Sequence, residues 1–155
     1  MANTYTQIYI HVVLVVKWRT NLISKDWKEL LYKYISGIIT NKKQKLMIIN
    51  GMPDHVHILL SLGPSINLSE LVRDIKANSS KWINEEKMVN TLFRWQEGFG
   101  AFSVSPGNVK TVIEYIKNQE EHHSRKTFRE EYILFLKESG VDYKEEYLFT
   151  EIKTD

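Results

Sequence analysis

The sequence predicts an α+β domain of the ferredoxin-like (RRM-like) type, with an antiparallel sheet, two covering helices and added C-terminal helices. β-branched and aromatic runs alternate as strands do, apolar residues recur at helical spacing between them, and the segments follow a β-α-β-β-α-β order. A length of 155 residues with 43% hydrophobic residues suits one domain over residues 1–155. We expect its core at about 4–122 and a C-terminal helix and tail at 123–155.

The composition excludes several classes of protein. The chain has no cysteine, which excludes a disulfide framework and a thiolate zinc site and favours the cytoplasm as its compartment. No signal peptide is visible, and the apolar run at 8–16 is too short to span a bilayer. We therefore expect a cytoplasmic protein without membrane contact.

Charge is spread unevenly along the chain, although its net value is only +2. Residues 1–50 hold eight Lys/Arg against two acids, whereas residues 101–155 hold eight against eleven. This asymmetry suggests a basic region able to meet phosphates, and a solvated basic helix face explains it equally well.

The first strand is predicted at residues 4–16, a β-branched and aromatic run. One of its faces is apolar throughout, while the other begins with polar and aromatic residues, namely Tyr5, Gln7, Tyr9 and His11. A helix follows, because apolar residues then recur at helical spacing. These are Trp27, Leu30, Leu31, Tyr34, Ile35, Ile38 and Ile39. We interpret this stripe as core.

A β-hairpin is predicted next, with a strand at 46–50 and a turn at Asn50-Gly51. Its second strand carries His55 and His57. Since side chains alternate along a strand, both histidines project from one face and their apolar neighbours from the other. Two imidazoles are thus presented at a separation that a single metal ion can bridge.

The second half of the chain predicts one more strand and three helices. A helix follows Gly63-Pro64, and residues 91–105 look like the last strand, interrupted by Gly98 and Gly100. Ser105-Pro106 begins the next helix, and a final helix is expected at 128–139. In the ferredoxin-like architecture two helices cover one sheet face, so we expect His55 and His57 on the open face.

A second group of polar side chains lies on the helix after Pro106. Tyr115, Gln119 and His122 stand at i, i+4 and i+7, in a band beside the apolar stripe. Boundary packing is the ordinary explanation of such a tyrosine. We expect His123 to be solvated near a helix end, whereas the role of His122 stays open.

Two motifs together resemble the single-tyrosine HUH transposases, the small single-strand transposases of minimal bacterial insertion sequences and their relatives associated with repetitive palindromes. They are Met-Pro-Asp-His-Val-His at 52–57 and Tyr-Ile-Lys-Asn-Gln-Glu-Glu-His-His at 115–123. Residues 16–19 and 95–105 are also similar to that family, and the resemblance runs from about residue 4 to 149.

The resemblance implies an enzyme that nicks and transfers single-stranded DNA beside a hairpin, through a 5′-phosphotyrosine intermediate. Tyr115 is then the catalytic nucleophile, and His55, His57 and Gln119 are the metal ligands. The family works as a homodimer in which the tyrosine helix of one subunit completes the other's site. The cofactor is a divalent ion, Mg²⁺ or Mn²⁺, and imidazole ligands favour Mn²⁺.

Other roles rest on chemistry alone. Lys17, Arg19, Arg73 and Lys76 are candidate DNA-binding cations, and each of them is also an ordinary surface cation. His122 is a candidate for supporting the metal ligands without itself binding the ion. A protein acting on DNA is expected to be nucleoid-associated.

Two alternative functions remain open. One is a non-catalytic or domesticated hairpin nucleic-acid-binding protein on the same fold. The other is a zinc hydrolase using His55 and His57, which is disfavoured because no third histidine or carboxylate is placed by motif.

Overall fold

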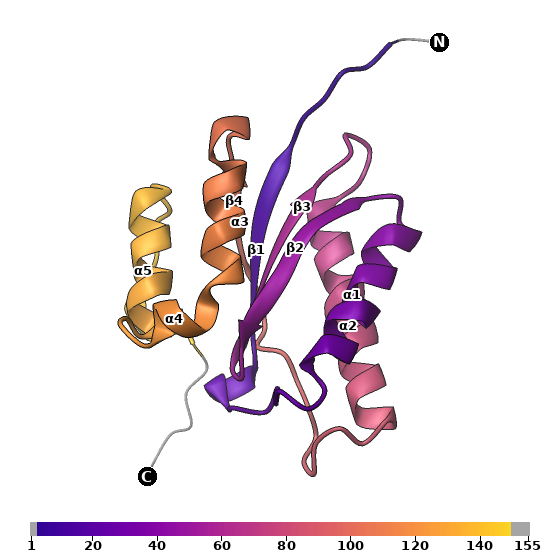
Figure 1. The fold of residues 1–155 in the computed structure, drawn as a ribbon, viewed down its shortest axis with the longest axis vertical. Helices are drawn as coiled ribbons and strands as arrows, with labels where there is room; N and C mark the ends of the chain where they lie inside the picture. The colour runs from indigo at the N-terminus through magenta and orange to yellow at the C-terminus, as the bar shows by residue number, and fades with distance from the viewer. Residues whose placement is uncertain (1–2, 150–155) are drawn as a thin grey trace.

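A computed structural model describes residues 3–149, and its sheet confirms the predicted fold class. Four antiparallel strands lie in the order β2-β3-β1-β4 (Figure 1). Their bounds are Tyr9–Val15 for β1, Lys45–Met52 for β2, His55–Ser61 for β3 and Gly100–Val104 for β4. With one helix between β1 and β2 and another between β3 and β4, this is the ferredoxin-like arrangement.

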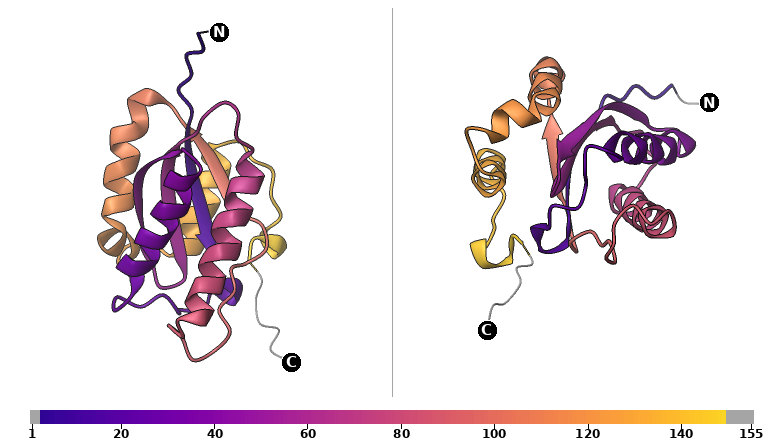
Figure 2. Two further views of the ribbon diagram at one scale, coloured as in Figure 1. Left: turned by 90° about the vertical axis from the view of Figure 1, so that its right-hand side faces the viewer. Right: turned by 60° about the horizontal axis from the view of Figure 1, so that its bottom comes forward.

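Helices cover both faces of the sheet (Figures 1 and 2). On one face lie α1 (Lys28–Asn41) and α2 (Leu68–Glu85). On the other lie α3 (Val109–Lys117), α4 (Gln119–His123) and α5 (Phe128–Glu138). Short 3₁₀ turns occur at Lys17–Arg19, Pro106–Asn108 and Glu145–Tyr147. Within residues 3–149, no helix is both long and apolar enough to cross a membrane.

The main core lies between the sheet and the first two helices. β1 contributes its apolar face, with Val12 and Leu14 each 1% exposed. The helices contribute the residues that periodicity predicts, among them Leu31, Ile35, Ile39, Leu71, Val72 and Ile75. Leu30, expected in the same stripe, is instead 49% exposed. Burial of these side chains fixes which strand face points away from α1 and α2.

The opposite sheet face is not open, contrary to the expectation from the fold. Val13 and Val15 on this face pack against Phe102 of β4 and against apolar residues of α5 and the following segment. Those residues are Phe128, Tyr132, Leu136, Leu148 and Phe149. The C-terminal helices therefore form a second, smaller core, and the histidines of β3 lie beneath it.

The hairpin turn lies three residues later than the sequence predicts. Asn50 and Gly51 are paired within β2, and the chain turns at Pro53-Asp54. A Cβ at Gly51 would collide with the backbone of His55, so the glycine here allows a close approach of the two strands and does not form the turn.

Asn50 connects β2 to α3. Its Nδ2 donates to the carbonyl oxygens of Ile116 and Lys117 at 3.0 and 3.2 Å.

The predicted strand at 91–105 is mostly irregular. Only Gly100–Val104 pairs with β1, and Trp95 makes an isolated bridge with Val16. Gly98 has a φ of +78°, which ends regular pairing before β4. Lys76 of α2 holds the segment in place, since its Nζ donates to the carbonyl oxygens of Gln96 and Gly98 at 2.6 and 2.8 Å.

Candidate metal centre and tyrosine site

His55 and His57 lie at the start of β3 on the face covered by α3, α4 and α5. Both are 0% exposed. Their neighbour Val56 points to the other face and into the main core. The alternation that the sequence predicts is therefore confirmed, but the two imidazoles are buried and not displayed to solvent.

Each of these imidazoles is held through its Nδ1 atom. His55 Nδ1 lies 2.7 Å from Asp54 Oδ1, and His57 Nδ1 lies 2.8 Å from Nε2 of His11 on β1. Partners of this kind fix the tautomer and orientation of a metal-binding histidine. With Nδ1 engaged, both rings present Nε2 to the same space under the C-terminal helices.

Burial sets the protonation state of the His11 and His57 rings. It lowers the pKa of His11 to about 3, with a further contribution from His57. Burial also lowers the pKa of His57 to about 4, although the nearby Glu131 carboxylate opposes the shift. Both imidazoles are consequently neutral at pH 7, the form in which histidine binds metals.

The predicted third ligand is brought to the histidines by a break in the helix. The helix expected to run through Tyr115 and Gln119 ends at Lys117 and restarts at Gln119, with Asn118 between. Asn50 accounts for the position of this break, since it binds the last carbonyls of α3. Gln119 is 0% exposed, and its Oε1 lies 3.3 Å from His55 Nε2.

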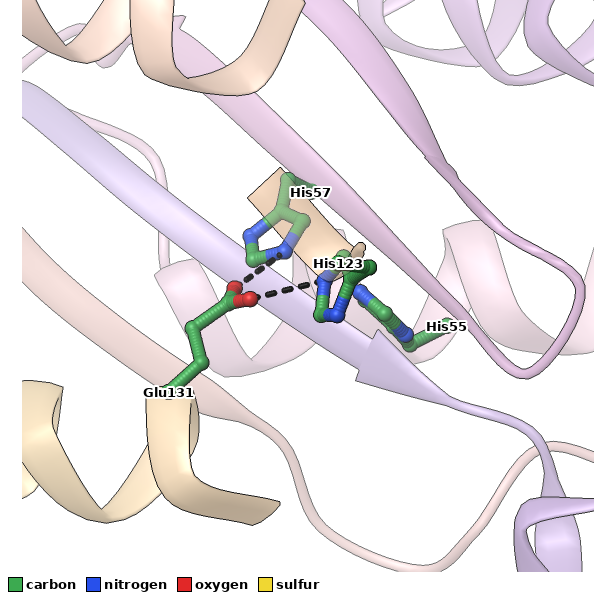
Figure 3. A group of neighbouring side chains, drawn as sticks. All are labelled: His55, His57, His123 and Glu131. Atoms are coloured by element: carbon green, nitrogen blue, oxygen red, sulfur yellow. Dashed lines mark ion pairs between the residues drawn. The ribbon is translucent and has the colours of Figure 1, made fainter. Parts of the chain in front are cut away.

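Two further residues, which the sequence did not single out as ligands, complete the cluster. His123 of α4 and Glu131 of α5 place one donor atom each within 4.8 Å of those of His55 and His57 (Figure 3). The His123 side chain is only 9% exposed, so the expectation of a solvated residue is wrong. Glu131 is 2% exposed, and its carboxylate lies between His57 and His123 (Figure 3).

The residues present fit a divalent cation. Glu131 Oε1 lies 2.9 Å from His57 Nε2, and Oε2 lies 2.7 Å from His123 Nε2. Neither oxygen has a well-aligned hydrogen bond from residues 3–149. A buried carboxylate is costly unless a cation or hydrogen bonds stabilise it. Imidazole, amide and carboxylate donors around this charge are the ligand types that Mn²⁺, Zn²⁺ and related ions take.

Tyr115 stands beside the same cluster. Its ring centroid lies 5.8 Å from that of His57 and 4.8 Å from that of His122, and its hydroxyl is buried without a well-aligned partner among residues 3–149. Burial raises the pKa of the phenol, and the Glu131 carboxylate raises it further. Tyr115 is therefore protonated at pH 7, and the neighbouring His122 side chain is 32% exposed.

A cavity of about 360 Å³ gives access to this tyrosine from outside. Tyr115 and His122 line it together with Glu114, Glu121 and Arg125. Arg125 is the cation at its rim, with a side chain 80% exposed. The cavity exposes part of the Tyr115 side chain, while the hydroxyl itself stays buried.

The four cations expected to bind DNA separate into two groups. Lys17, Arg73 and Lys76 line one cavity of about 490 Å³, together with Arg94 and the partly exposed Phe99. We call this cavity the α2 groove. Arg94 also lines this groove, although no sequence motif singles it out.

Arg19 lies apart from the α2 groove. It is 3.9 Å from Asp54 and lies over the ring of Phe149 at 4.8 Å.

The sequence disfavours a zinc hydrolase because no motif places a third histidine or a carboxylate beside His55 and His57. The structure removes this objection. His123 and Glu131 supply the third histidine and the carboxylate that no motif had placed. The hydrolase alternative leaves Tyr115 unexplained, whose hydroxyl is buried beside these residues.

Comparisons with known proteins point to one family. The sequence model of the family described as "Transposase IS200 like" matches residues 4–119. The ISDra2 transposase TnpA of Deinococcus radiodurans is 23% identical over 118 residues, which are 73% of this chain and 84% of that protein. The transposase of insertion sequence IS200 from Salmonella typhimurium is 23% identical over 125 residues, 77% of this chain and 81% of that protein.

Solved structures share the fold. A putative transposase from Deinococcus radiodurans R1 superposes with a TM-score of 0.63 at 20% identity, covering 77% of this chain and 95% of its own. A REP-associated tyrosine transposase, solved bound to a REP hairpin, gives 0.61 at 14% identity, covering 79% of this chain and 73% of its own. Because the family's sequence model spans most of the chain, from strand β1 to Gln119, the protein belongs to the IS200-like transposase family.

Proposed function

We propose that this protein is a transposase that cleaves and rejoins single-stranded DNA at hairpin-flanked sites, with Tyr115 as its nucleophile. The observation that carries the proposal is a tyrosine whose hydroxyl is buried, with no well-aligned hydrogen bond from residues 3–149, beside a cluster of candidate metal-binding atoms. Membership of the IS200-like family supports strand transfer, and a hairpin-bound structural neighbour supports the substrate class.

His55, His57 and Gln119 are proposed to hold a divalent metal, Mg²⁺ or Mn²⁺. Their Nε2 and Oε1 atoms face one another, and Asp54 and His11 hold the two rings in place from behind. When bound, such an ion neutralises phosphate charge and lowers the pKa of groups beside it.

The chemistry of the chain itself is a transesterification. The Tyr115 hydroxyl oxygen attacks the phosphorus atom, and the bond from phosphorus to the 3′ oxygen breaks. A 5′-phosphotyrosine forms, and the proton lost by the phenol is balanced by the proton gained by the free 3′-OH. The bond energy is retained, so a later 3′-OH can attack the same phosphorus and rejoin strands without a nucleotide triphosphate.

Within the single chain, Tyr115 lies beside His57, and Asn50 of β2 binds the last carbonyls of α3. The family resemblance supports a homodimer in which the tyrosine helix of one subunit completes the other's site, an arrangement that differs from the one in the single chain. We propose a homodimer acting in the cytoplasm on nucleoid DNA.

A gel assay tests the proposal. The protein is incubated with single-stranded hairpin DNA and Mn²⁺ or Mg²⁺, and covalent protein–DNA adducts are separated under denaturing conditions. We expect Tyr115→Phe to abolish the adduct and to leave hairpin binding intact. Tyr147→Phe is the matched control, because that side chain is 75% exposed and lies outside the site.

Two results contradict the proposal. A Tyr115→Phe variant that still forms the adduct removes the assigned nucleophile. Hairpin binding by the unmodified protein without cleavage in either metal identifies the non-catalytic alternative instead.

A further inference from the structure

Beyond the ligands that the family motif provides, the C-terminal helices bring two donors into the same centre. His123 and Glu131 both lie after residue 119, where the match to the family ends. Their inclusion therefore rests on the packing of α4 and α5 in this chain: His123 ends the motif at 115–123 but has no metal role in it, and Glu131 lies outside both motifs.

The donor atoms are spaced as ligands of one ion. His57 Nε2 is 2.9 Å from Glu131 Oε1, and His123 Nε2 is 2.7 Å from Glu131 Oε2. Gln119 Oε1 is 3.1 Å from His123 Nε2 and 3.3 Å from His55 Nε2. Adjacent ligands in an octahedral shell with bonds of 2.0–2.1 Å are about 3 Å apart, which agrees with this series.

The charge of Glu131 gives an independent reason. In the described part of the chain, no lysine or arginine forms an ion pair with this carboxylate. The residues within ion-pair distance of it are His57, His122 and His123. Neutral imidazoles do not offset a buried negative charge, whereas a divalent cation does.

The position of Glu131 is also firmly set by packing. Its neighbours in sequence along the buried face of α5 are Phe128 and Tyr132, both in the second core. The Phe128 ring stacks on His55 with centroids 3.7 Å apart and an interplanar angle of 4°. The carboxylate is thus carried to the centre by a helix that the aromatic contacts hold in place.

We infer that His123 and Glu131 are metal ligands, so that the ion is bound by three imidazoles, an amide and a carboxylate contributed by β3, α4 and α5. This inference rests on the proposed metal-dependent function and extends it to the class of metal. A donor set with three imidazoles favours Mn²⁺, Zn²⁺ or a related transition metal over Mg²⁺, which prefers an oxygen shell.

The test measures metal affinity without any DNA. The full-length protein, freed of metal, competes with a chromophoric chelator for Mn²⁺, Zn²⁺ or Mg²⁺, and dissociation constants are obtained for each variant. We expect Glu131→Gln to weaken Mn²⁺ and Zn²⁺ binding at least tenfold, and His123→Gln to do likewise. Glu130→Gln is the matched control on α5, since that residue is exposed and is expected to leave affinity unchanged.

A spectroscopic measurement guards against misfolded variants. Co²⁺ is added to each protein, and its visible absorption reports the ligand set directly. We expect the spectrum to change in Glu131→Gln while circular dichroism and thermal unfolding without metal stay like those of Glu130→Gln.

Defined outcomes overturn the inference. An unchanged dissociation constant and Co²⁺ spectrum in Glu131→Gln exclude it as a ligand, and Mg²⁺ binding as tight as Mn²⁺ binding contradicts the donor set. If the Tyr115 adduct still forms in either case, the proposed function stands and only this inference fails. If the unmodified protein binds no metal at all, both fail.

Discussion

The Nε2 atom of His11 lies 2.8 Å from the Nδ1 atom of His57, so an imidazole on β1 orients an imidazole on β3 from behind the metal donors. The two residues are only 2% and 0% exposed, so the contact lies in the interior of the protein. His57 can then hold its proton on Nδ1 and present Nε2 as a ligand.

From this contact we predict that His11→Ala weakens metal binding about 10- to 100-fold, as loss of a ligand-orienting partner does. The measurement is chelator competition with Mn²⁺, and Tyr9→Phe on the same strand is the control. Because His11 supplies no donor to the cluster, an unchanged affinity in His11→Ala would show that β1 plays no part in orienting His57.

The metal-free protein is predicted to lose stability in mild acid. Burial lowers the pKa of His57 to about 4 and that of His11 to about 3 in the folded state. Unfolded histidines bind protons below about pH 6.5, whereas the folded ones stay neutral, so stability falls as pH decreases from about 6.5 to 4. The loss from His57 alone is on the order of 3 kcal/mol at 1.36 kcal/mol per pKa unit.

Urea unfolding in EDTA at pH 7.5 and pH 5 measures this effect. His11→Phe removes one of the two groups, so its stability should depend less on pH than that of the unmodified protein. Equal unfolding free energies at both pH values in the unmodified protein would contradict the buried, neutral state of these rings.

The α2 groove is predicted to contribute phosphate contacts. Arg73 and Arg94 line it, and each substitution to alanine should weaken hairpin binding and reduce the slope of log K against log salt by about 0.7–0.9. Lys76→Ala should instead lower the free energy of unfolding, because Lys76 Nζ donates hydrogen bonds to the carbonyl oxygens of Gln96 and Gly98.

Fluorescence anisotropy with a labelled hairpin over a range of NaCl concentrations gives these slopes. Lys81→Ala is the control, since Lys81 is 72% exposed and pairs with Glu85 outside the groove. Slopes that do not change in Arg73→Ala and Arg94→Ala would place the DNA on another surface.

Strand alternation and helical periodicity were enough to predict the sheet and its main core. They show which face of a strand or helix is apolar. For β1 and β3 this is enough to predict which alternate side chains point into the main core. The turn at Asn50-Gly51 was mispredicted because a glycine required for close strand approach has the same sequence appearance as a turn glycine.

The rest of the site depends on docking, which periodicity does not encode. A single uninterrupted helix would place His122 in the band with Tyr115, but the break at Asn118 turns His123 inward as well. Glu131 reads as one of several acids on an amphipathic helix. Only the packing of α5 on the sheet reveals that this acid is buried beside two strand histidines.

The central claim is that Tyr115 becomes covalently joined to DNA. The direct measurement is mass spectrometry of the protein after reaction with single-stranded hairpin DNA and Mn²⁺, followed by nuclease and protease digestion to locate the attached nucleotide. We predict a 5′-phosphonucleotide on the peptide that contains Tyr115, at that residue. A nucleotide found on any other side chain, or cleaved DNA without any attached protein, would contradict it.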